Sequence, residues 1–560
     1  MKNIMKASDL FVKCLEEEGV TRIFGLPGEE NSDLMISLKK STKIDFVLCR
    51  HEQAAAFMAD SFGRLTGKAG VCLSTLGPGV TNLITGLADA NMDRAPVVAI
   101  IGQGSTKRLH KESHQIMNSI NMLQPISKWA QTILSPKNIT EVVRKAFKVA
   151  ETEKPGVTVI EFPEDIAKEK VVDTPIKPIL TRRPAADYRA INEAIELILK
   201  SKKPIILAGN GTIRKRASER LRVLVNNLGI GVVNTFMGKG AISYEDQHSL
   251  FTIGLGNEDY NNLAIDDSDL VIAIGYDLVE YSPSSWNKRE GRKKKIIHID
   301  YTPAEIDKDY LPNVEIISDL AGALYQLNKE LLIRVNKNKI PLFNISTRSK
   351  LRKEMLSDLE KNHKDNSFPM KPQRILADVR RILKPDDILL SDVGAHKMWV
   401  ARQYNCSVPN TCLISNGFCS MGFALPGSIG AKMAFPNKRV LSINGDAGFL
   451  MNIQELETAV RKKINIVAVV WLDGEHGLVK WKQIVEYDGM HSNLSFNNPN
   501  FSSLAKSFNM WGREIKSTEE FLPSLKLAFR KNCPAIIGVP VDYSQNMNLA
   551  KHLGDSPHIL

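Results

Sequence analysis

The chain has 560 residues, of which 43% are apolar and 24% are charged. These proportions are ordinary for globular proteins and argue against extensive disorder, and the length predicts two to four domains. The longest apolar runs, such as Ile464–Leu472 with its one interruption at Asn465, are far shorter than the ~20 residues that span a bilayer, so we expect no membrane partner.

The formal net charge of +12 invites comparison with nucleic-acid-binding proteins. Such proteins gather lysine and arginine, with interleaved aromatic residues, on one surface. Here the lysines are scattered, and the one dense run, Arg292–Lys295, precedes the pattern of an apolar strand. The charge therefore favours solubility and attraction of anionic substrates, and we expect no nucleic-acid partner.

The N-terminal segment carries an acidic cluster at Glu16–Glu18, which interrupts any apolar stretch of the kind found in secretory signals. The seven cysteines include no CxxC pair and no zinc-ligand spacing with histidine. Reduced, mostly buried thiols are the simplest interpretation. The sequence therefore predicts a cytoplasmic protein.

The chain contains three blocks of alternating strand and helix patterns. The first, residues 1–172, opens with an amphipathic helix pattern over Ala7–Glu18 and continues with strand patterns at Asp45–Cys49, Val71–Ser74 and Val97–Ile101. The segment Asp173–Tyr188 has three prolines and no periodicity, which predicts a linker.

The second block, residues 189–334, begins with a strand pattern at Pro204–Ala208, which ends in the turn Gly-Asn-Gly at Gly209–Gly211. Further strands are predicted at Leu270–Ile274 and Ile296–Ile299.

A polar stretch, Val335–Pro372, leads to the third block, residues 373–550. Continuous apolar strands bounded by glycine, with helices between them, are typical of parallel sheets covered on both faces. We therefore predict an α/β protein of three consecutive doubly wound parallel-sheet domains.

The third block contains a strand pattern at Val440–Ile443, a helix pattern at Met451–Arg461 and a second strand within Ile464–Leu472. A right-handed crossover makes such strands parallel, and neighbouring strands lie about 5 Å apart. Asp446 and Asp473 follow the two strands, so their carboxylates are expected to face one point at the sheet edge.

Two carboxylates with nearby backbone carbonyls make a hard oxygen site that suits Mg²⁺. Ala447 and Gly448 stand where a helix begins, so their backbone N–H groups are suited to phosphate oxygens. Either aspartate alone is also explained as the end of a strand or a helix cap. The pair in this frame favours a metal and diphosphate site.

These residues resemble the metal-binding signature of thiamine-diphosphate enzymes, in which Gly445-Asp446 is followed by Asp473, 27 residues after the first aspartate. The surrounding stretch GDAGFLMNIQELETAV resembles the acetolactate synthase group. Three motifs of the first block are similar to the same group: FGLPG at Phe24–Gly28, RHEQA at Arg50–Ala54 with GRLTGK, and STLGPGVTN at Ser74–Asn82.

The resemblance extends over essentially the whole chain. TFMGKGAI at Thr235–Ile242 and SDLVIAIGYDLVEYSPSSWN at Ser268–Asn287 are similar to acetolactate synthases of the catabolic type, as is HKESHQ at His110–Gln115. This type does not bind FAD, and the turn at Gly209–Gly211 lacks the GxGxxG frame, so FAD is not expected.

The resemblance implies the thiamine-diphosphate enzyme fold, with the pyrimidine held by the first domain and the diphosphate by the third. It implies thiamine diphosphate and Mg²⁺ as cofactors. It also implies active sites between subunits, hence a homodimer or homotetramer.

The same motifs also imply which residues would form the cofactor and metal site. Glu52 would bond the pyrimidine ring, although a glutamate in a first helical turn is also what the helix dipole favours without function. The metal ligands implied are Asp446, Asp473 and the backbone carbonyl of Glu475. The cofactor contacts implied are Glu52, Gly394, Ala395, His396, Cys419 through its carbonyl, Met421, Gly445, Asp446, Ala447, Gly448, Asp473, Glu475, His476, Gly477 and Leu478.

The reaction implied is decarboxylation of pyruvate and condensation of the remaining two-carbon unit, carried on the cofactor, with a second pyruvate to give 2-acetolactate and CO₂. Gln115, His114 and Gln103 would line the substrate pocket. Ala447 and Asp473 depart from the usual metal motif, but neither change removes an oxygen ligand. Glu30 and Trp481 also depart from the usual pattern, and these two leave the acceptor open. Another thiamine-diphosphate-dependent 2-oxo-acid carboligase or decarboxylase is the alternative; a non-catalytic relative would be expected to lack Glu52 or Asp446.

Overall fold

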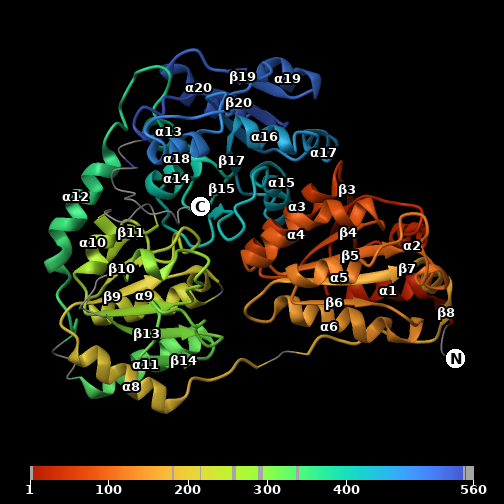
Figure 1. The fold of residues 1–560 in the computed structure, drawn as a ribbon, viewed down its shortest axis with the longest axis horizontal. Coiled ribbons are helices and arrows are strands. Elements are labelled where there is room, and N and C mark those ends of the chain that lie inside the picture. The colour runs from red at the N-terminus through yellow and green to blue at the C-terminus, as the bar shows by residue number, and fades with distance from the viewer. Residues whose placement is uncertain are drawn as a thin grey trace.

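A computed structural model describes residues 4–546 and 549, apart from 180–181, 215, 255–259, 288–293 and 336–339. In these residues the chain forms three six-stranded parallel sheets, each covered by helices on both faces (Figure 1). We call them the first, middle and third domains in chain order. The predicted α/β class with three doubly wound sheets is confirmed. No helix of the described residues is long and apolar enough to cross a membrane.

The first domain has the strand order β3-β2-β4-β5-β7-β6. Its strands are β2 (Arg22–Gly25), β3 (Asp45–Leu48), β4 (Gly70–Ser74), β5 (Val97–Gln103), β6 (Trp129–Thr132) and β7 (Val157–Pro163). Apolar faces of α1 (Ala7–Glu17), α2 (Ser32–Lys40) and α6 (Ile139–Glu151) cover one side. The other side is covered by α3 (Glu52–Thr66) and α4 (Pro78–Met92). Short elements complete it: α5 (Ser119–Leu123), α7 (Glu164–Lys168), and an antiparallel pair of β1 (Met5–Lys6) with β8 (Lys170–Val171).

The middle domain has the order β11-β10-β9-β12-β13-β14. Its strands are β9 (Pro204–Ala208), β10 (Gly231–Asn234), β11 (Ser249–Thr252), β12 (Leu270–Ile274), β13 (Lys295–Asp300) and β14 (Val314–Ile317). Its helices are α8 (Tyr188–Lys200), α9 (Ala217–Leu228), α10 (Tyr260–Asp266) and α11 (Leu320–Arg334). The strand order reverses direction between β9 and β12, which makes that point the ligand crevice expected of an open α/β sheet. The basic run at Arg292–Lys295 lies partly outside the described residues.

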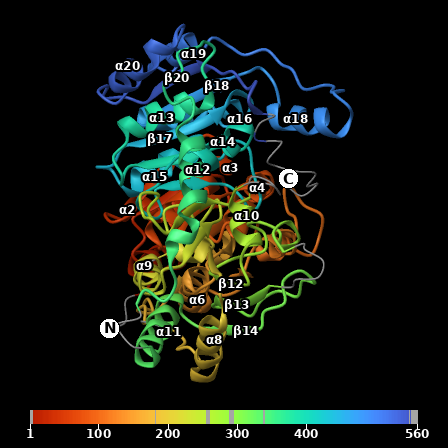
Figure 2. The same cartoon turned by 90° about the vertical axis from the view of Figure 1, so that its left-hand side faces the viewer.

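The third domain has the order β16-β15-β17-β18-β20-β19. Its strands are β15 (Ile388–Ser391), β16 (Cys412–Ile414), β17 (Val440–Gly445), β18 (Val467–Leu472), β19 (Trp511–Glu514) and β20 (Ala535–Pro540). Its helices are α13 (Pro372–Ile382), α14 (Ala395–Gln403), α15 (Ala424–Ala434), α16 (Asp446–Met451), α17 (Glu455–Arg461), α18 (Gly477–Glu486), α19 (Phe501–Ser507) and α20 (Thr518–Ala528). Helix α12 (Ser349–Glu360) joins it to the middle domain along one side of the molecule (Figure 2).

Helices α3 and α15 join the first and third domains. The rings of Phe57 and Phe423 meet edge to face with centroids 5.7 Å apart, and the Ser61 hydroxyl donates to the Gly427 carbonyl over 2.7 Å. Gly430 lies so close to α3 that an added Cβ would stand 2.3 Å from the Met58 carbonyl oxygen. One continuous apolar core therefore runs from the first domain into the third.

The helix expected at Met451–Arg461 is wrong as a single element. The chain forms α16 directly after β17, turns at Asn452, and resumes as α17 at Glu455. The Asn452 amide donates to the Gly422 carbonyl over 2.8 Å, a contact outside the helix. Competition of an asparagine side chain with helical bonding favours such a break.

Candidate active site

The two aspartates of the predicted metal site lie together at the carboxyl edge of the third sheet. Gly445 of β17 pairs with Trp471 of β18, so Asp446 and Asp473 leave adjacent strands. The Asp446 carboxylate is buried and accepts hydrogen bonds from the Asp473 and Gly474 backbone N–H groups over 3.1 and 2.8 Å. The Asn498 amide donates to the same oxygen over 2.7 Å.

The electrostatics of this edge favour a cation. Burial and the charges of Asp446 and Glu475 raise the pKa of Asp473 to about 7. Neighbouring carboxylates repel when both are ionised, and a divalent cation between them removes that cost.

Glu475 follows the second aspartate and turns its side chain away from the pair. Its carboxylate accepts from Lys480 over 2.6 Å and from the Ser495 hydroxyl over 3.1 Å, which lowers its pKa. This arrangement leaves the backbone carbonyl, rather than the side chain, as its possible metal ligand. In the described part of the chain no three His, Cys, Asp or Glu side chains gather as a metal site, so backbone and diphosphate oxygens would have to complete the shell.

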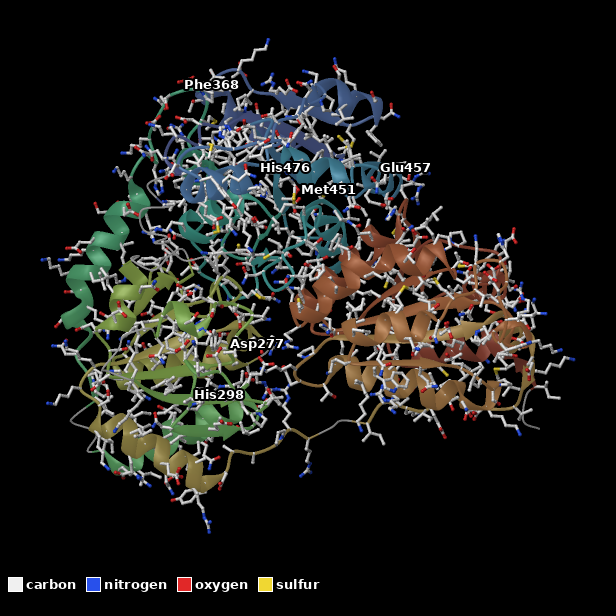
Figure 3. The ribbon with its side chains drawn as sticks, in the orientation of Figure 1. Asp277, His298, Phe368, Met451, Glu457 and His476 are labelled. Carbon is white, nitrogen blue, oxygen red and sulfur yellow. The ribbon has the colours of Figure 1, made fainter. Side chains whose placement is uncertain are left out.

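Helix α18 begins beside the aspartate pair. His476 precedes it, its ring centroid 5.4 Å from that of Phe496, and Gly477 and Leu478 form its first turn. A Cβ on Gly477 would stand 2.9 Å from Asp473 Oδ2, so the Asp473 carboxylate lies directly against the first residue of α18. The N-terminal end of α18 therefore faces the same edge. Figure 3 labels His476 and Met451 in this domain.

His396 lies between two glycines. A Cβ on Gly394 or on Gly445 would come within 2.8 or 3.0 Å of its ring. The ring is buried beside Trp471, and burial lowers the pKa of His396 to about 3, so it is neutral. Among the described residues its Nε2 has no hydrogen-bond partner.

The loop from Ser415 to Met421 is held by the first domain. The Ser415 hydroxyl donates to Asp89 over 2.6 Å, and the Gly417 N–H donates to Asp93 over 2.7 Å. Cys419 has φ +57°, a left-handed backbone that cysteine rarely adopts. Its sulfur accepts from the buried ammonium of Lys397, 3.0 Å away, which helps to hold this conformation.

The residues present fit a magnesium diphosphate. The donor set is two carboxylates with adjacent carbonyls and helix N-terminal N–H groups. Within the residues that the structure describes, buried polar atoms without a partner collect around this edge: Asp392 Oδ2, His396 Nε2 and Asn498 Oδ1. A Cβ on Gly448 would meet Asp392 Oδ2 at 2.8 Å, so Gly448 keeps this part of the site open.

Glu52 is the first residue of α3 and is 7% exposed. Its Oε2 accepts from the Asn82 amide of α4 over 3.0 Å, and Oε1 faces Gly79, whose absent Cβ would stand 3.4 Å away. Two of the predicted motifs, RHEQA and STLGPGVTN, thus meet in space, because α3 and α4 pack side by side. Glu30 joins them from the next loop, accepting from Thr75 over 3.2 Å.

The predicted substrate residues occupy different settings. Gln115 is exposed, has φ +57° and contacts Gly77 at the start of α4, two residues from the Gly79 that faces Glu52. His114 precedes it and is also exposed. Gln103 is buried at the end of β5, where its amide donates to Glu161 and the Met117 carbonyl and accepts from Gly104. Gln103 thus anchors the loop that carries the other two.

Sequence reasoning missed several residues of this site. Asn82 lay within a recognised motif, but nothing in the motif indicated its contact with Glu52. Asn498 and Lys397 lie outside the metal signature, and their contacts depend on loops that only the fold brings in. Trp481, which departs from the family position, is buried in α18 among the core residues of the third domain.

Comparison with known proteins agrees with this geometry. Three thiamine pyrophosphate enzyme models match: the N-terminal TPP binding domain at residues 5–122, the central domain at 191–327 and the C-terminal TPP binding domain at 392–539. The acetolactate synthase of Bacillus subtilis (strain 168) is 34% identical over 556 residues, 97% of this chain and 95% of that protein. The chain belongs to the acetolactate synthase family.

Other members of the family show the same full-length similarity. The catabolic acetolactate synthase of Raoultella terrigena is 34% identical over 546 residues, 96% of this chain and 95% of that protein. A probable acetolactate synthase large subunit of Methanocaldococcus jannaschii is 35% identical over 562 residues, 96% and 92% of the two chains. The predicted family and its thiamine pyrophosphate domains are thus confirmed, and the chain is an enzyme of this family.

Proposed function

We propose that the protein is a catabolic-type acetolactate synthase that converts two pyruvate molecules into 2-acetolactate and CO₂. The observation that carries this proposal is the meeting of Asp446 and Asp473 at adjacent strand ends, in a chain that also presents a buried Glu52. Mg²⁺ would bind the two aspartates and the Glu475 carbonyl. Gly445, Ala447 and Gly448, with Gly394 to His396 and His476 to Leu478, would hold the diphosphate.

Bound thiamine diphosphate would supply a carbon nucleophile for the keto group of pyruvate and an acceptor for the electrons released with CO₂. The chain would supply orientation and proton transfer. Glu52 would hold a proton at the pyrimidine ring, while Asn82 orients its carboxylate. The Cys419 carbonyl and Met421 would position the ring, and Gln115, His114 and Gln103 would form or support the pyruvate pocket.

The length of α3 supports active sites between subunits. In one chain, Arg64 near the end of α3 donates to the Ile414 carbonyl, next to the loop that would bind the pyrimidine. Glu52 is twelve residues earlier in the same helix, and at 1.5 Å per residue it stands ~18 Å away along the helix axis. The start of this loop is therefore distant from Glu52 of the same chain, which is consistent with a site that takes the two from different chains. We therefore propose a homodimer or homotetramer whose sites combine Glu52 of one chain with the third domain of another.

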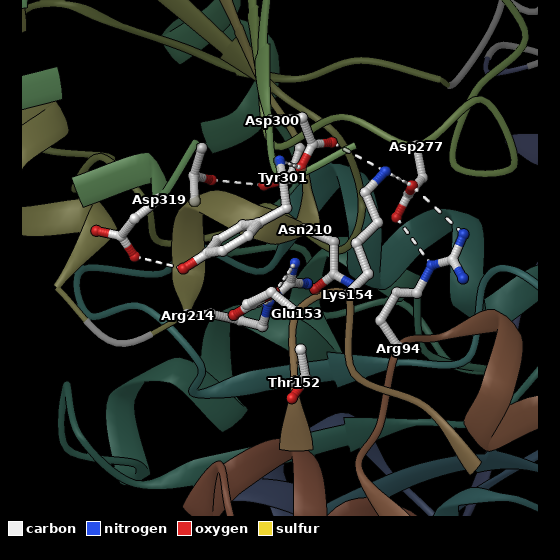
Figure 4. A network of polar contacts seen from close by, with 12 residues as sticks. Arg94, Thr152, Glu153, Lys154, Asn210, Arg214, Asp277, Asp300, Tyr301 and Asp319 are labelled. Atoms are coloured by element: carbon white, nitrogen blue, oxygen red, sulfur yellow. Dashed lines mark hydrogen bonds and ion pairs between the residues drawn. The ribbon is translucent and has the colours of Figure 1, made fainter. Parts of the chain in front are cut away.

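The switch point of the middle sheet supports the absence of FAD. In this strand order a dinucleotide phosphate binds at the turn after the first strand, here Gly209–Gly211. The buried Glu280 carboxylate accepts from the Asn210 N–H at that turn, over 3.0 Å, and from the Asp277 N–H. A second carboxylate-rich network joins this part of the middle domain to the first domain, with Lys154 between Asp277 and Asp300 (Figure 4). Purified protein is therefore expected to show no flavin absorbance.

The remaining proposals concern the cellular location, the domain bounds and the substrate. We place the enzyme in the cytoplasm, consistent with seven cysteines that form no disulfide. Domain bounds of 1–172, 189–334 and 373–550 remain our proposal, the last bound lying outside the described residues. Pyruvate is the proposed small-molecule partner.

Product analysis tests the function. Incubation with pyruvate, thiamine diphosphate and Mg²⁺ is expected to give a product that yields acetoin after acid treatment. Acetaldehyde alone would instead assign the chain to the 2-oxo-acid decarboxylases, and neither product would refute both activities.

A further inference from the structure

The connection between β3 and α3 delivers Glu52 to its site, and one third-domain side chain holds it. The backbone N–H groups of Arg50 and His51 both donate to Oε1 of Glu455, each over 3.0 Å. The Thr458 hydroxyl donates to the other oxygen over 2.7 Å. Glu455 is fully buried at the start of α17, some 400 residues away in sequence.

Other contacts align α17 with the same segment. Arg461 donates to the Leu48 carbonyl, and Lys462 binds both carboxylate oxygens of Asp45 over 2.9 Å. Helix α17 and the residue after it, Lys462, therefore contact β3 and the segment that follows β3 at three points. Figure 1 shows α17 and β3 next to each other. Glu457, on the exposed side of α17, marks this junction in Figure 3.

We propose that Glu455 is a positioning residue for the reaction: its buried carboxylate fixes the backbone at Arg50 and His51 and thereby the place of the Glu52 carboxylate. This inference rests on the proposed role of Glu52. Charge-assisted hydrogen bonds to backbone N–H groups are among the stronger ones in proteins, and a negative charge at the N-terminal end of α3 is favourable. Catalysis is sensitive to small displacements of the reacting group, so loss of the Glu455 contacts should lower the reaction rate as well as the stability of the fold.

The environment of Glu455 supports the geometry. Burial raises the pKa of this carboxyl to about 7, while the bonds from Thr458, Arg50 and His51 act in the opposite direction. Burying a carboxylate without hydrogen-bond donors costs free energy, and removing the Glu455 carboxylate leaves its donors without an acceptor. The backbone N–H groups of the consecutive residues Arg50 and His51 would then have lost this acceptor.

The chain offers a matched control. Glu280 is also a buried glutamate that accepts two backbone N–H groups, those of Asn210 and Asp277, and a threonine hydroxyl, that of Thr235. Burial raises its pKa to about 7 as well. Glu280→Gln should therefore disturb stability much as Glu455→Gln does, without touching the segment before Glu52.

The first experiment uses the protein without cofactor. Hydrogen–deuterium exchange is followed in peptides covering residues 49–53 of the wild type, Glu455→Gln, Glu455→Ala and Glu280→Gln. We expect exchange at Arg50 and His51 to rise roughly tenfold in Glu455→Ala, less in Glu455→Gln, and not in Glu280→Gln. Unchanged exchange in both Glu455 variants would overturn the proposal. If Glu455→Ala does not fold, Glu455→Gln alone decides.

The second experiment adds thiamine diphosphate and Mg²⁺. We expect cofactor affinity in Glu455→Gln to stay within about threefold of the wild type, while exchange of the cofactor C2 proton falls roughly tenfold. Glu280→Gln should keep the wild-type exchange rate. Equal rates in all three proteins would overturn the proposal. If the wild type makes no acetolactate, the proposed function fails, yet amide exchange still reports whether Glu455 fixes this backbone.

Discussion

At the residue scale, the proposed chemistry depends on a few carboxylates with different surroundings. Glu52 is buried and accepts from one amide donor, Asn82. At the proposed metal site, Asp446 accepts from several N–H groups, and Asp473 lies beside the charges of Asp446 and Glu475. The surroundings of Glu52 suit proton transfer, and those of Asp446 and Asp473 suit a metal ion. This division of roles leads to two predictions.

Glu52→Gln keeps the shape of the side chain but removes its proton-transfer capacity. We expect CO₂ release from pyruvate to fall by ~10²–10⁴-fold while cofactor binding, held mainly through the third domain, changes little. Release of CO₂ and quenching of tryptophan fluorescence by the cofactor measure the two effects. Glu141→Gln on the exposed side of α6 serves as the control. Unchanged turnover in Glu52→Gln would remove the residue from this role.

Removal of the metal should release the cofactor. Dialysis against a chelator is expected to abolish acetolactate formation, and added Mg²⁺ should restore it, because two carboxylates hold the diphosphate only through a cation. Asp473→Asn retains an oxygen ligand and should keep metal-dependent activity, whereas Asp473→Ala should weaken cofactor binding by roughly tenfold or more. Equal cofactor affinity in the alanine variant would contradict the site.

At the element scale, the sequence predicts strands and the residues at their ends well. Pro204–Ala208 and Leu270–Ile274 are observed as predicted, and Asp446 and Asp473 are adjacent because a βαβ unit leaves little choice. The contacts of Glu455 with Arg50 and of Lys397 with Cys419 could not be predicted, since they depend on how separate elements dock. The break at Asn452 has the same origin, because its partner Gly422 lies in another loop.

The α3–α15 contact has no room for a side chain at Gly430. Gly430→Ala places a Cβ 2.3 Å from the Met58 carbonyl, so the helices must separate, and we expect a loss of ~1–3 kcal/mol in the free energy of unfolding. Chemical denaturation measures it. Gly322→Ala in α11 meets nothing closer than 3.4 Å and should be neutral or slightly stabilising. Similar stabilities for the two variants would show that α3 and α15 do not pack this closely.

A buried acidic cluster between α3 and α4 makes stability depend on pH. Burial raises the pKa of Asp60 to about 7, and it also raises those of Asp89 and Asp93, while Arg64 opposes the shift of Asp60. The pKa of Asp60 in the folded protein lies above its value in the unfolded chain, so the protonated carboxyl stabilises the fold. This contribution to the free energy of unfolding is complete below about pH 4 and is lost as the pH rises through about 7.

Asp60→Asn removes one of these titrations. Relative to the wild type, its free energy of unfolding should therefore increase between pH 5 and pH 8, by ~2 kcal/mol. Denaturation at both pH values measures this change, with the exposed Asp386→Asn as the control. A constant difference between variant and wild type would show that Asp60 does not titrate in this range.

At the scale of the whole molecule, the proposed site combines Glu52 of one chain with the third domain of another. Glu52 begins α3, whereas the start of the Ser415–Met421 loop is held near the C-terminal ends of α3 and α4, where Arg64 donates to the Ile414 carbonyl and Asp93 accepts from the Gly417 N–H. Mixed oligomers of two inactive variants, Glu52→Gln and Asp446→Ala, test this arrangement. If each site combines two chains, half of the dimers formed from an equal mixture are mixed, and one of their two sites is intact. Activity should then recover to about a quarter of the wild-type value. Sites within single chains would give no recovery, because every chain carries one defect.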